Sequence, residues 1–296
     1  MAAAACFLAL VFLPARGLAQ TDHSPCYDPK ASADATITSC SELLSSGSLS
    51  ATNRPIAYYD RGIGYEAKGQ IDLAFADYTA ALSLNPNYFE AFTNRGNMYR
   101  RKGQDDLAIA DYTTSLRINP NYVLAYNNRG FVYHTKGQDD SAITDYNAAL
   151  RIDPNYVFAL KNRGYALFDM GRFNDAASDF GRAVDLQPSS AYAVLWLHAA
   201  LRRSGVADPD LAKRSAALST TWPSPIVAIF LNQKTPEPVL SAAQECEGTF
   251  FAAEAQLWDD EIAHARSLFT HLISTCPRSE AEYIAAAQAE LTRLPK

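Results

Sequence analysis

The sequence predicts an all-α fold in which antiparallel helix pairs are stacked one after another. Three kinds of residue that shape helix pairs, namely glycine, alanine and proline, return every 34 residues. They are Gly62, Gly96, Gly130 and Gly164; Ala74, Ala108, Ala142 and Ala176; and Pro86, Pro120, Pro154 and Pro188. A period of this length is typical of helical repeats, in which each pair buries its apolar side against its neighbours.

The order of small and turn-forming residues defines the two helices of one repeat. In the repeat that starts at Pro55, Gly62 lies in the middle of the first helix and lets the second helix approach closely. Gly69 forms the turn between the helices, because glycine readily adopts the left-handed backbone that follows a helix. Ala74 is the matching small residue of the second helix. Pro86 ends this helix, because the residue before a proline disfavours the helical conformation.

The repeated segments resemble the tetratricopeptide repeat (TPR) family. The resemblance rests on segments such as YYDRGIGYEAKGQIDLAFADYTAALSLNP and YNNRGFVYHTKGQDDSAITDYNAALRIDP. It covers the region 55–188, as four repeats at about 55–88, 89–122, 123–156 and 157–190. The resemblance implies a TPR superhelix of antiparallel helix pairs, whose curved surface binds other proteins.

An arginine and an aspartate also recur together in every repeat. They are Arg61, Arg95, Arg129 and Arg163, with Asp77, Asp111, Asp145 and Asp179. One interpretation is a ladder of partly buried arginine–aspartate pairs between the two helices of each repeat. The other is that the arginine row binds an anion. The joint recurrence of the two charges favours the ladder.

The TPR resemblance also implies that the first helix of each repeat lines a concave groove. The candidates for peptide binding in this groove are Asn94, Asn97, Asn127, Asn128, Phe131, His134, Phe158, Lys161, Asn162, Tyr165 and Phe168. Asparagine amides can bond the backbone of an extended peptide through both donor and acceptor, and the aromatic rings would form an apolar patch. Two interpretations stay open: a partner binds this groove, or the C-terminal region packs into it. The carboxylate clamp of some chaperone-binding TPR domains is not expected, because Tyr59 and Ile63 stand where it needs lysine and asparagine.

The N-terminus predicts export. Residues 1–13 form an apolar run that is too short to span a bilayer as a helix, and the small residues Gly17 and Ala19 follow it. We interpret residues 1–19 as a signal peptide that is cleaved after Ala19. No cysteine stands directly after the apolar run, so a lipid anchor is not expected. The mature chain is expected in the periplasm or outside the cell.

Four cysteines remain once the signal peptide, which contains Cys6, is removed: Cys26, Cys40, Cys246 and Cys276. Four cysteines allow three pairings. We expect Cys26–Cys40 and Cys246–Cys276, because the members of each pair are close in sequence. In an oxidising compartment the first pair staples an N-terminal cap at 20–54. In a reducing compartment all four would be small apolar residues.

The chain after the regular repeats is predicted to be helical but irregular. Residues 191–245 are expected to form connecting helices, and 246–296 a degenerate TPR-like hairpin with a capping helix. A repeat that starts at Cys246 places Cys276 at the end of its second helix. The two cysteines then lie side by side in the antiparallel hairpin, within reach of a disulfide.

The C-terminal region also resembles the NlpI-type periplasmic TPR proteins. The residues that carry this resemblance are Leu195-Trp196-Leu197, Trp222-Pro223, the run Ile226–Leu231 and Phe250-Phe251. It implies a dimeric adaptor that scaffolds peptidoglycan hydrolases and presents one to a periplasmic protease. Proteins of that type are lipoproteins, and this chain departs from them at the lipid anchor. A homodimer is left open.

Composition and motifs argue against two classes of function, nucleic-acid binding and enzyme activity. The 296 residues carry 26 basic and 32 acidic side chains, a net charge of −6 that argues against nucleic-acid binding. The histidines are dispersed and no HExxH, GxSxG or P-loop motif is present, so neither enzyme activity nor a cofactor is expected. We therefore expect a non-enzymatic protein–protein interaction scaffold in the bacterial periplasm, linked to a peptidoglycan hydrolase or a protease. The alternative is a secreted TPR factor that acts outside the cell.

Overall fold

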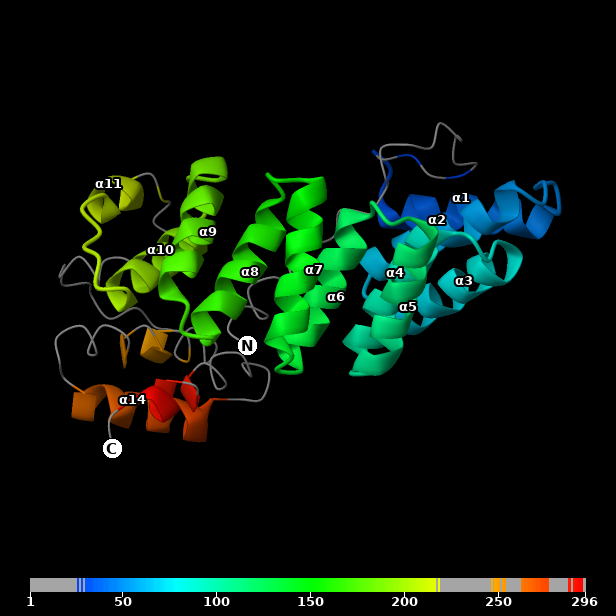
Figure 1. The fold of residues 1–296 in the computed structure, drawn as a ribbon. Coiled ribbons are helices and arrows are strands. Elements are labelled where there is room, and N and C mark those ends of the chain that lie inside the picture. The colour runs from blue at the N-terminus through cyan, green and yellow to red at the C-terminus, as the bar shows by residue number, and fades with distance from the viewer. Residues whose placement is uncertain are drawn as a thin grey trace. The chain divides into compact units, whose positions relative to one another are not determined.

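The structure is a computed structural model that describes residues 30–216 without a break. It also describes residues 26, 28, 218, 246, 248–250, 252–253, 262–276, 287–288 and 290–294. Every secondary-structure element within these ranges is a helix (Figure 1). The chain divides into two compact units that meet between Val132 and Tyr133. We call them the N-terminal unit and the C-terminal unit and describe each by itself.

The N-terminal unit is a stack of helix pairs. Its helices are α1 (Ala33–Ser46), α2 (Asn53–Ala67), α3 (Ile71–Leu84), α4 (Phe89–Arg101), α5 (Asp105–Ile118) and most of α6 (Val123–Thr135). Helix α2 packs on α3 and α4 packs on α5, as the two helices of one repeat. Helix α3 also packs on α4 and joins the two repeats. The predicted fold of consecutive antiparallel helix pairs is confirmed.

The repeated glycine of the first helix makes room for an aromatic ring. A Cβ atom at Gly96 would lie 2.7 Å from Cε1 of Tyr112. In the C-terminal unit, a Cβ atom at Gly164 would lie 2.8 Å from Cζ of Phe180. The repeated alanines, such as Ala108, are fully buried. The predicted close approach of the two helices is therefore present. The glycine, however, faces an aromatic ring, whereas the sequence suggested that it faces the repeated alanine.

Helix α1 serves as the second helix of an incomplete repeat before α2, on which it packs. Arg61 of α2 donates a hydrogen bond from Nη1 to Oγ of Ser41 in α1, at 3.2 Å. Cys26 is joined to Cys40 of α1 at an Sγ–Sγ distance of 2.03 Å. Cys40 is fully buried. This is the pairing expected from the cysteine spacing, and it ties the segment before α1 to the repeat stack.

The C-terminal unit continues the repeats past Pro188 with the first helix of a further, incomplete pair. Its helices are α7 (Asp139–Ile152), α8 (Val157–Asp169), α9 (Phe173–Leu186), α10 (Ala191–Arg203), α11 (Leu211–Ser215) and α14 (Ile262–Thr275). Helix α8 packs on α9, and α10 packs on α9 as the first helix of a fifth pair. Gly205 follows α10 with φ of 75°, as Gly171 follows α8 with φ of 77°. The turn glycine therefore keeps its 34-residue period, and the short α11 replaces a full second helix.

Trp196 of α10 is the centre of an aromatic core in the C-terminal unit. Its ring centroid lies 5.1 Å from those of Tyr165 and Phe168 in α8. It also lies 5.7 Å from the ring of Phe250, which comes from the C-terminal region. Side chains that are far apart in sequence thus fill one core.

The second cysteine pair lies in the same unit. Cys246 is joined to Cys276, which follows α14, at an Sγ–Sγ distance of 2.15 Å. Residues 219–245 of the predicted connecting region lie outside the described residues. The predicted signal peptide and part of the predicted capping helix lie outside them as well.

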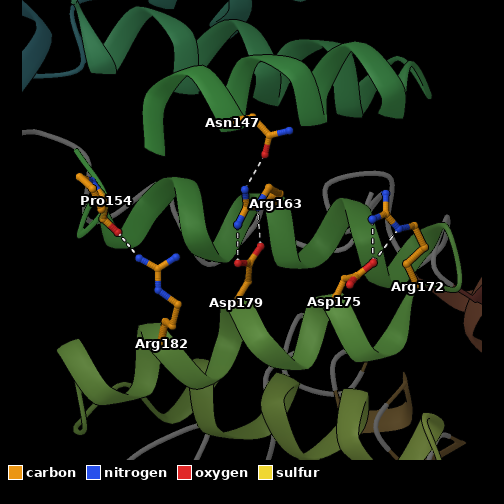
Figure 2. A network of polar contacts seen from close by, with 7 residues as sticks. All are labelled: Asn147, Pro154, Arg163, Arg172, Asp175, Asp179 and Arg182. Carbon is orange, nitrogen blue, oxygen red and sulfur yellow. Dashed lines mark hydrogen bonds and ion pairs between the residues drawn. The ribbon is translucent and has the colours of Figure 1, made fainter. Parts of the chain in front are cut away.

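The repeated arginine forms the predicted ladder with the repeated aspartate. Arg95 donates two hydrogen bonds of 2.7 and 2.8 Å to Asp111, and Arg163 donates two of 2.6 Å to Asp179. Nη1 of Arg163 also donates to Oδ1 of Asn147 in the preceding repeat, at 2.5 Å. Figure 2 shows Arg163 between Asn147 and Asp179. The structural interpretation is confirmed for these pairs, and Arg163 also fastens two repeats together.

Candidate protein-binding surface

The predicted groove residues differ in exposure between the two units. The buried ones are Asn94, Asn127, His134, Lys161, Asn162, Tyr165 and Phe168; the partly exposed ones are Asn97, Asn128, Phe131 and Phe158. Three of the four partly exposed side chains belong to the N-terminal unit. The surface that a partner can reach is therefore concentrated there.

The amides of Asn97, Asn127 and Asn128 form one hydrogen-bonded chain, while Asn94 donates to the hydroxyl of Tyr59 at 3.2 Å. Oδ1 of Asn97 accepts hydrogen bonds from the hydroxyl of Tyr112 at 2.7 Å and from Nδ2 of Asn128 at 3.0 Å. Asn127 donates from Nδ2 to Oδ1 of Asn128 at 3.2 Å. Within the described residues, Nδ2 of Asn97 has no hydrogen-bond partner. This donor can bond a backbone carbonyl of an extended peptide.

Arg100, which was not among the predicted residues, belongs to the same surface. Its guanidinium lies 5.1 Å from the ring centroid of Phe131 in α6. Burial raises the pKa of the Tyr112 hydroxyl, and the nearby charge of Arg100 opposes that rise. Stacking on an aromatic face is favourable for a cation, so the contact holds both side chains in place. The sequence signal for Arg100 is its position one helical turn after Asn97.

Glu66 of α2 is a second residue of this surface that was not among the candidates for peptide binding. The hydroxyl of Tyr78 donates to its Oε2 at 2.8 Å. Burial raises the pKa of Glu66, while the Tyr78 hydrogen bond and the charges of Arg101 and Arg100 oppose the rise. The first helices of the N-terminal unit therefore present a carboxyl group, a guanidinium, amides and a phenyl ring.

Two of the three aromatic candidates of the C-terminal unit, Tyr165 and Phe168, are core residues. Tyr165 and Phe168 are only 2% and 1% exposed, and both contact Trp196 edge to face. Lys161 and Asn162 are buried on the same helix. The aromatic patch expected here is not available to a partner, because α10 and the C-terminal region cover it. Of the two interpretations of the groove, packing by the C-terminal region holds in this unit.

His134 is buried between two carboxyl groups in the C-terminal unit. Its Nδ1 lies 2.6 Å from Oδ1 of Asp139, and its Nε2 lies 3.6 Å from Oδ2 of Asp169. These contacts connect the end of α6 with α7 and α8. Phe158 remains partly exposed, with Nζ of Lys161 5.4 Å from its ring centroid. His134 is therefore a structural residue in this arrangement.

The stretch 290–294 packs against the ends of α8 and α10. Arg293 donates a hydrogen bond to the backbone carbonyl of Asp169. The carboxylate of Glu290 is buried and lies 2.7 Å from Nη2 of Arg203. Arg203 and Arg293 both stack on Phe173, at 4.9 and 5.8 Å from the ring centroid.

Within the described part of the chain, no group of three or more histidine, cysteine, aspartate or glutamate side chains could hold a metal ion. None of its helices is both long enough and apolar enough to cross a membrane.

The repeat family is settled by comparison with known families. A family model described as TPR repeat matches residues 65–103, 96–137 and 132–171. A second model, described as tetratricopeptide repeat, matches residues 161–207. Residues 65–207 of the chain therefore carry TPR repeats. Repeats of this family form protein–protein interaction scaffolds, and the match at 161–207 includes the fifth turn glycine, Gly205.

Solved structures share the fold of this chain at low sequence identity. A tetratricopeptide repeat protein from Parabacteroides merdae has a TM-score of 0.54 at 17% identity, over 87% of this chain and 92% of that one. The pilF protein of Pseudomonas aeruginosa gives 0.53 at 16% identity, over 81% and 99%. YrrB, a TPR protein with an unusual peptide-binding site, gives 0.52 at 18% identity, over 66% and 98%. No curated protein sequence matches the chain, and the NlpI-type resemblance stays a prediction.

Proposed function

We propose that this TPR protein is a non-enzymatic scaffold of the bacterial periplasm that binds segments of other proteins on the first helices of its N-terminal unit. The observation that carries the proposal is the set of partly exposed side chains Asn97, Arg100, Asn128 and Phe131 on α4 and α6. They combine hydrogen-bonding groups with an aromatic ring, which is the mixture found where proteins bind other proteins.

The arrangement suits an extended peptide. The Nδ2 group of Asn97 can donate to a backbone carbonyl, and the stacked pair of Arg100 and Phe131 offers a flat contact for a side chain. The internal hydrogen bonds of Asn97 and Asn128 fix the amides before binding, which lowers the entropy cost of ordering them. YrrB, which has the same fold, offers a precedent for peptide binding by such a fold.

The periplasmic part of the proposal rests on other features. The apolar N-terminus with small residues at Gly17 and Ala19 is typical of a signal peptide. The two close cysteine pairs, Cys26–Cys40 and Cys246–Cys276, support an oxidising compartment. The resemblance to NlpI-type adaptors favours peptidoglycan hydrolases or a periplasmic protease as partners and leaves open a homodimer.

The test is a crosslinking pulldown from envelope extract with the purified chain. We expect hydrolases or a protease to be recovered by the wild type and lost with the double variant Asn97→Ala, Phe131→Ala. A matched control is Asn121→Ala with Leu107→Ala, which changes one amide and one apolar side chain that are exposed in the same unit. Equal recovery by all three proteins would move the binding site elsewhere. Cell fractionation tests the compartment, since recovery from the medium would favour the secreted alternative.

A further inference from the structure

Glu90 is a buried acid in the N-terminal unit that the proposed peptide contacts do not use. It lies in the first turn of α4 and is only 6% exposed. Within the described residues, it forms no ion pair with an arginine, lysine or histidine. A buried carboxylate without a cation is costly, because the protein interior replaces its water shell only poorly.

The surroundings of Glu90 are aromatic and acidic. Burial raises the pKa of the Tyr59 phenol well above its usual range, and the nearby phenols of Tyr122 and Tyr88 and carboxyl groups of Glu90 and Asp60 raise it further. The rings of Tyr59 and Tyr88 lie 4.8 Å apart. Asp60 is fully buried. Two carboxyl groups and three phenol rings therefore gather between α2, the start of α4 and the residue before α6.

This combination suits a cation. A carboxylate attracts an ammonium or guanidinium group directly, and the faces of tyrosine rings add a further attraction. Burial raises the pKa of Glu90 to about 7, so near neutral pH this carboxyl group holds a proton about half of the time. An incoming cation would replace that proton and compensate the buried charge.

The cluster can be approached from the surface that the proposed function uses. Glu90 stands four residues before Asn94 and seven before Asn97 on α4, so it belongs to the same helix face. Tyr88, which packs against the cluster of Tyr59, and Leu124, which packs against that of Tyr122, are partly exposed. A long, flexible side chain from a bound segment could reach the carboxylate past these residues, whereas a bulky rigid group could not.

We propose that Glu90, with Asp60 and the rings of Tyr59, Tyr88 and Tyr122, binds a lysine or arginine side chain of the partner segment. The assignment rests on the proposed function, because it needs a peptide on the inward face of the N-terminal unit. It adds a chemical requirement: partner segments carry a basic residue that enters this cluster, while their backbone lies along Asn97 and Asn128.

The test is selection of peptides from a phage-displayed library of random nonapeptides against the purified full chain at pH 8. We expect lysine and arginine to be enriched at least threefold at one position among the selected peptides. Glu90→Gln should still select peptides, but without this enrichment. Glu42→Gln, which changes an exposed glutamate of α1 in the same unit, should keep it.

A selected peptide then gives a direct measurement. Replacing its basic residue by norleucine should weaken binding to the wild type at least tenfold in a fluorescence anisotropy titration, but binding to Glu90→Gln by less than twofold. Circular dichroism checks that the variants are folded. Selected peptides without basic enrichment, or enrichment that survives Glu90→Gln, would overturn the cation site and leave the peptide groove intact. If the wild type selects no peptides at all, both the groove and the cation site are wrong.

Discussion

The N-terminal and C-terminal units use the same repeat positions for different purposes. In the N-terminal unit, α4 carries Asn97 and Arg100, which remain partly exposed. In the C-terminal unit, the equivalent positions of α8 carry Tyr165 and Phe168, which are buried against Trp196. The repeat backbone is shared, so the difference lies in the side chains and in what covers them. At these two positions, the apolar side chains of α8 pack on α10 of the same chain, whereas the polar side chains of α4 remain partly exposed.

The largest expected effect on stability comes from a substitution in the core of the C-terminal unit. Phe168→Ala removes a fully buried ring and should lower the free energy of unfolding by about 3–5 kcal/mol. Phe131→Ala removes a partly exposed ring and should cost less than about 1 kcal/mol. Urea denaturation followed by circular dichroism measures both values. Equal losses would show that the two rings have the same role in their units.

The second prediction concerns the feature that both units share. Arg95→Leu and Arg163→Leu each leave a buried aspartate, Asp111 or Asp179, without its bidentate partner. Each should cost about 3 kcal/mol, because an uncompensated buried charge remains. Replacing the aspartate by alanine in the same variant should restore part of the loss in chemical denaturation. An arginine row that instead bound an anion would lose little stability and would lose binding.

A sequence-based prediction succeeds where the deciding contacts are close in the chain and fails where they are distant. The glycine period and the arginine–aspartate pairs, which are 16 residues apart, could be read from the repeats. Burial of Tyr165 and Phe168 depends on Trp196 and Phe250, and nothing in the repeat pattern links Phe250 to α8. The fifth pair was partly missed because His198 replaces its central glycine, although Gly205 preserves the turn. The only sequence feature that points to Glu90 is its position on the inward face of α4.

The third prediction is a pH effect confined to the N-terminal unit. The folded protein keeps the proton of Glu90 up to about pH 7, whereas an ordinary glutamate releases it near 4.5. The folded state therefore binds more protons than the unfolded chain in this window, and stability falls as the pH rises. The loss from pH 5 to 7 should be about 2 kcal/mol from this residue. Denaturation at several pH values should show a smaller slope for Glu90→Gln, and an unchanged slope would contradict the raised pKa.

The fourth prediction concerns Asn128 and has the smallest expected effect on stability. Asn128→Ala removes one hydrogen bond to Asn97 at a partly exposed site and should change the free energy of unfolding by about 0.5–1 kcal/mol. Its effect on partner binding should be larger, because Asn97 loses the group that orients it. Measuring both the melting temperature of this variant and its affinity for a selected peptide separates the effect on stability from the effect on binding. A large loss of stability without a loss of affinity would make the amide chain a structural feature.

The most direct measurement is the affinity of one selected peptide for Phe131→Ala and Phe168→Ala under conditions in which both variants are folded. If the N-terminal unit binds partners and the aromatic face of the C-terminal unit is core, the dissociation constant should rise at least tenfold for Phe131→Ala. It should stay within about twofold of the wild type for Phe168→Ala. The opposite pattern, with affinity lost only in Phe168→Ala, would place the partner on the C-terminal unit and contradict the division of roles.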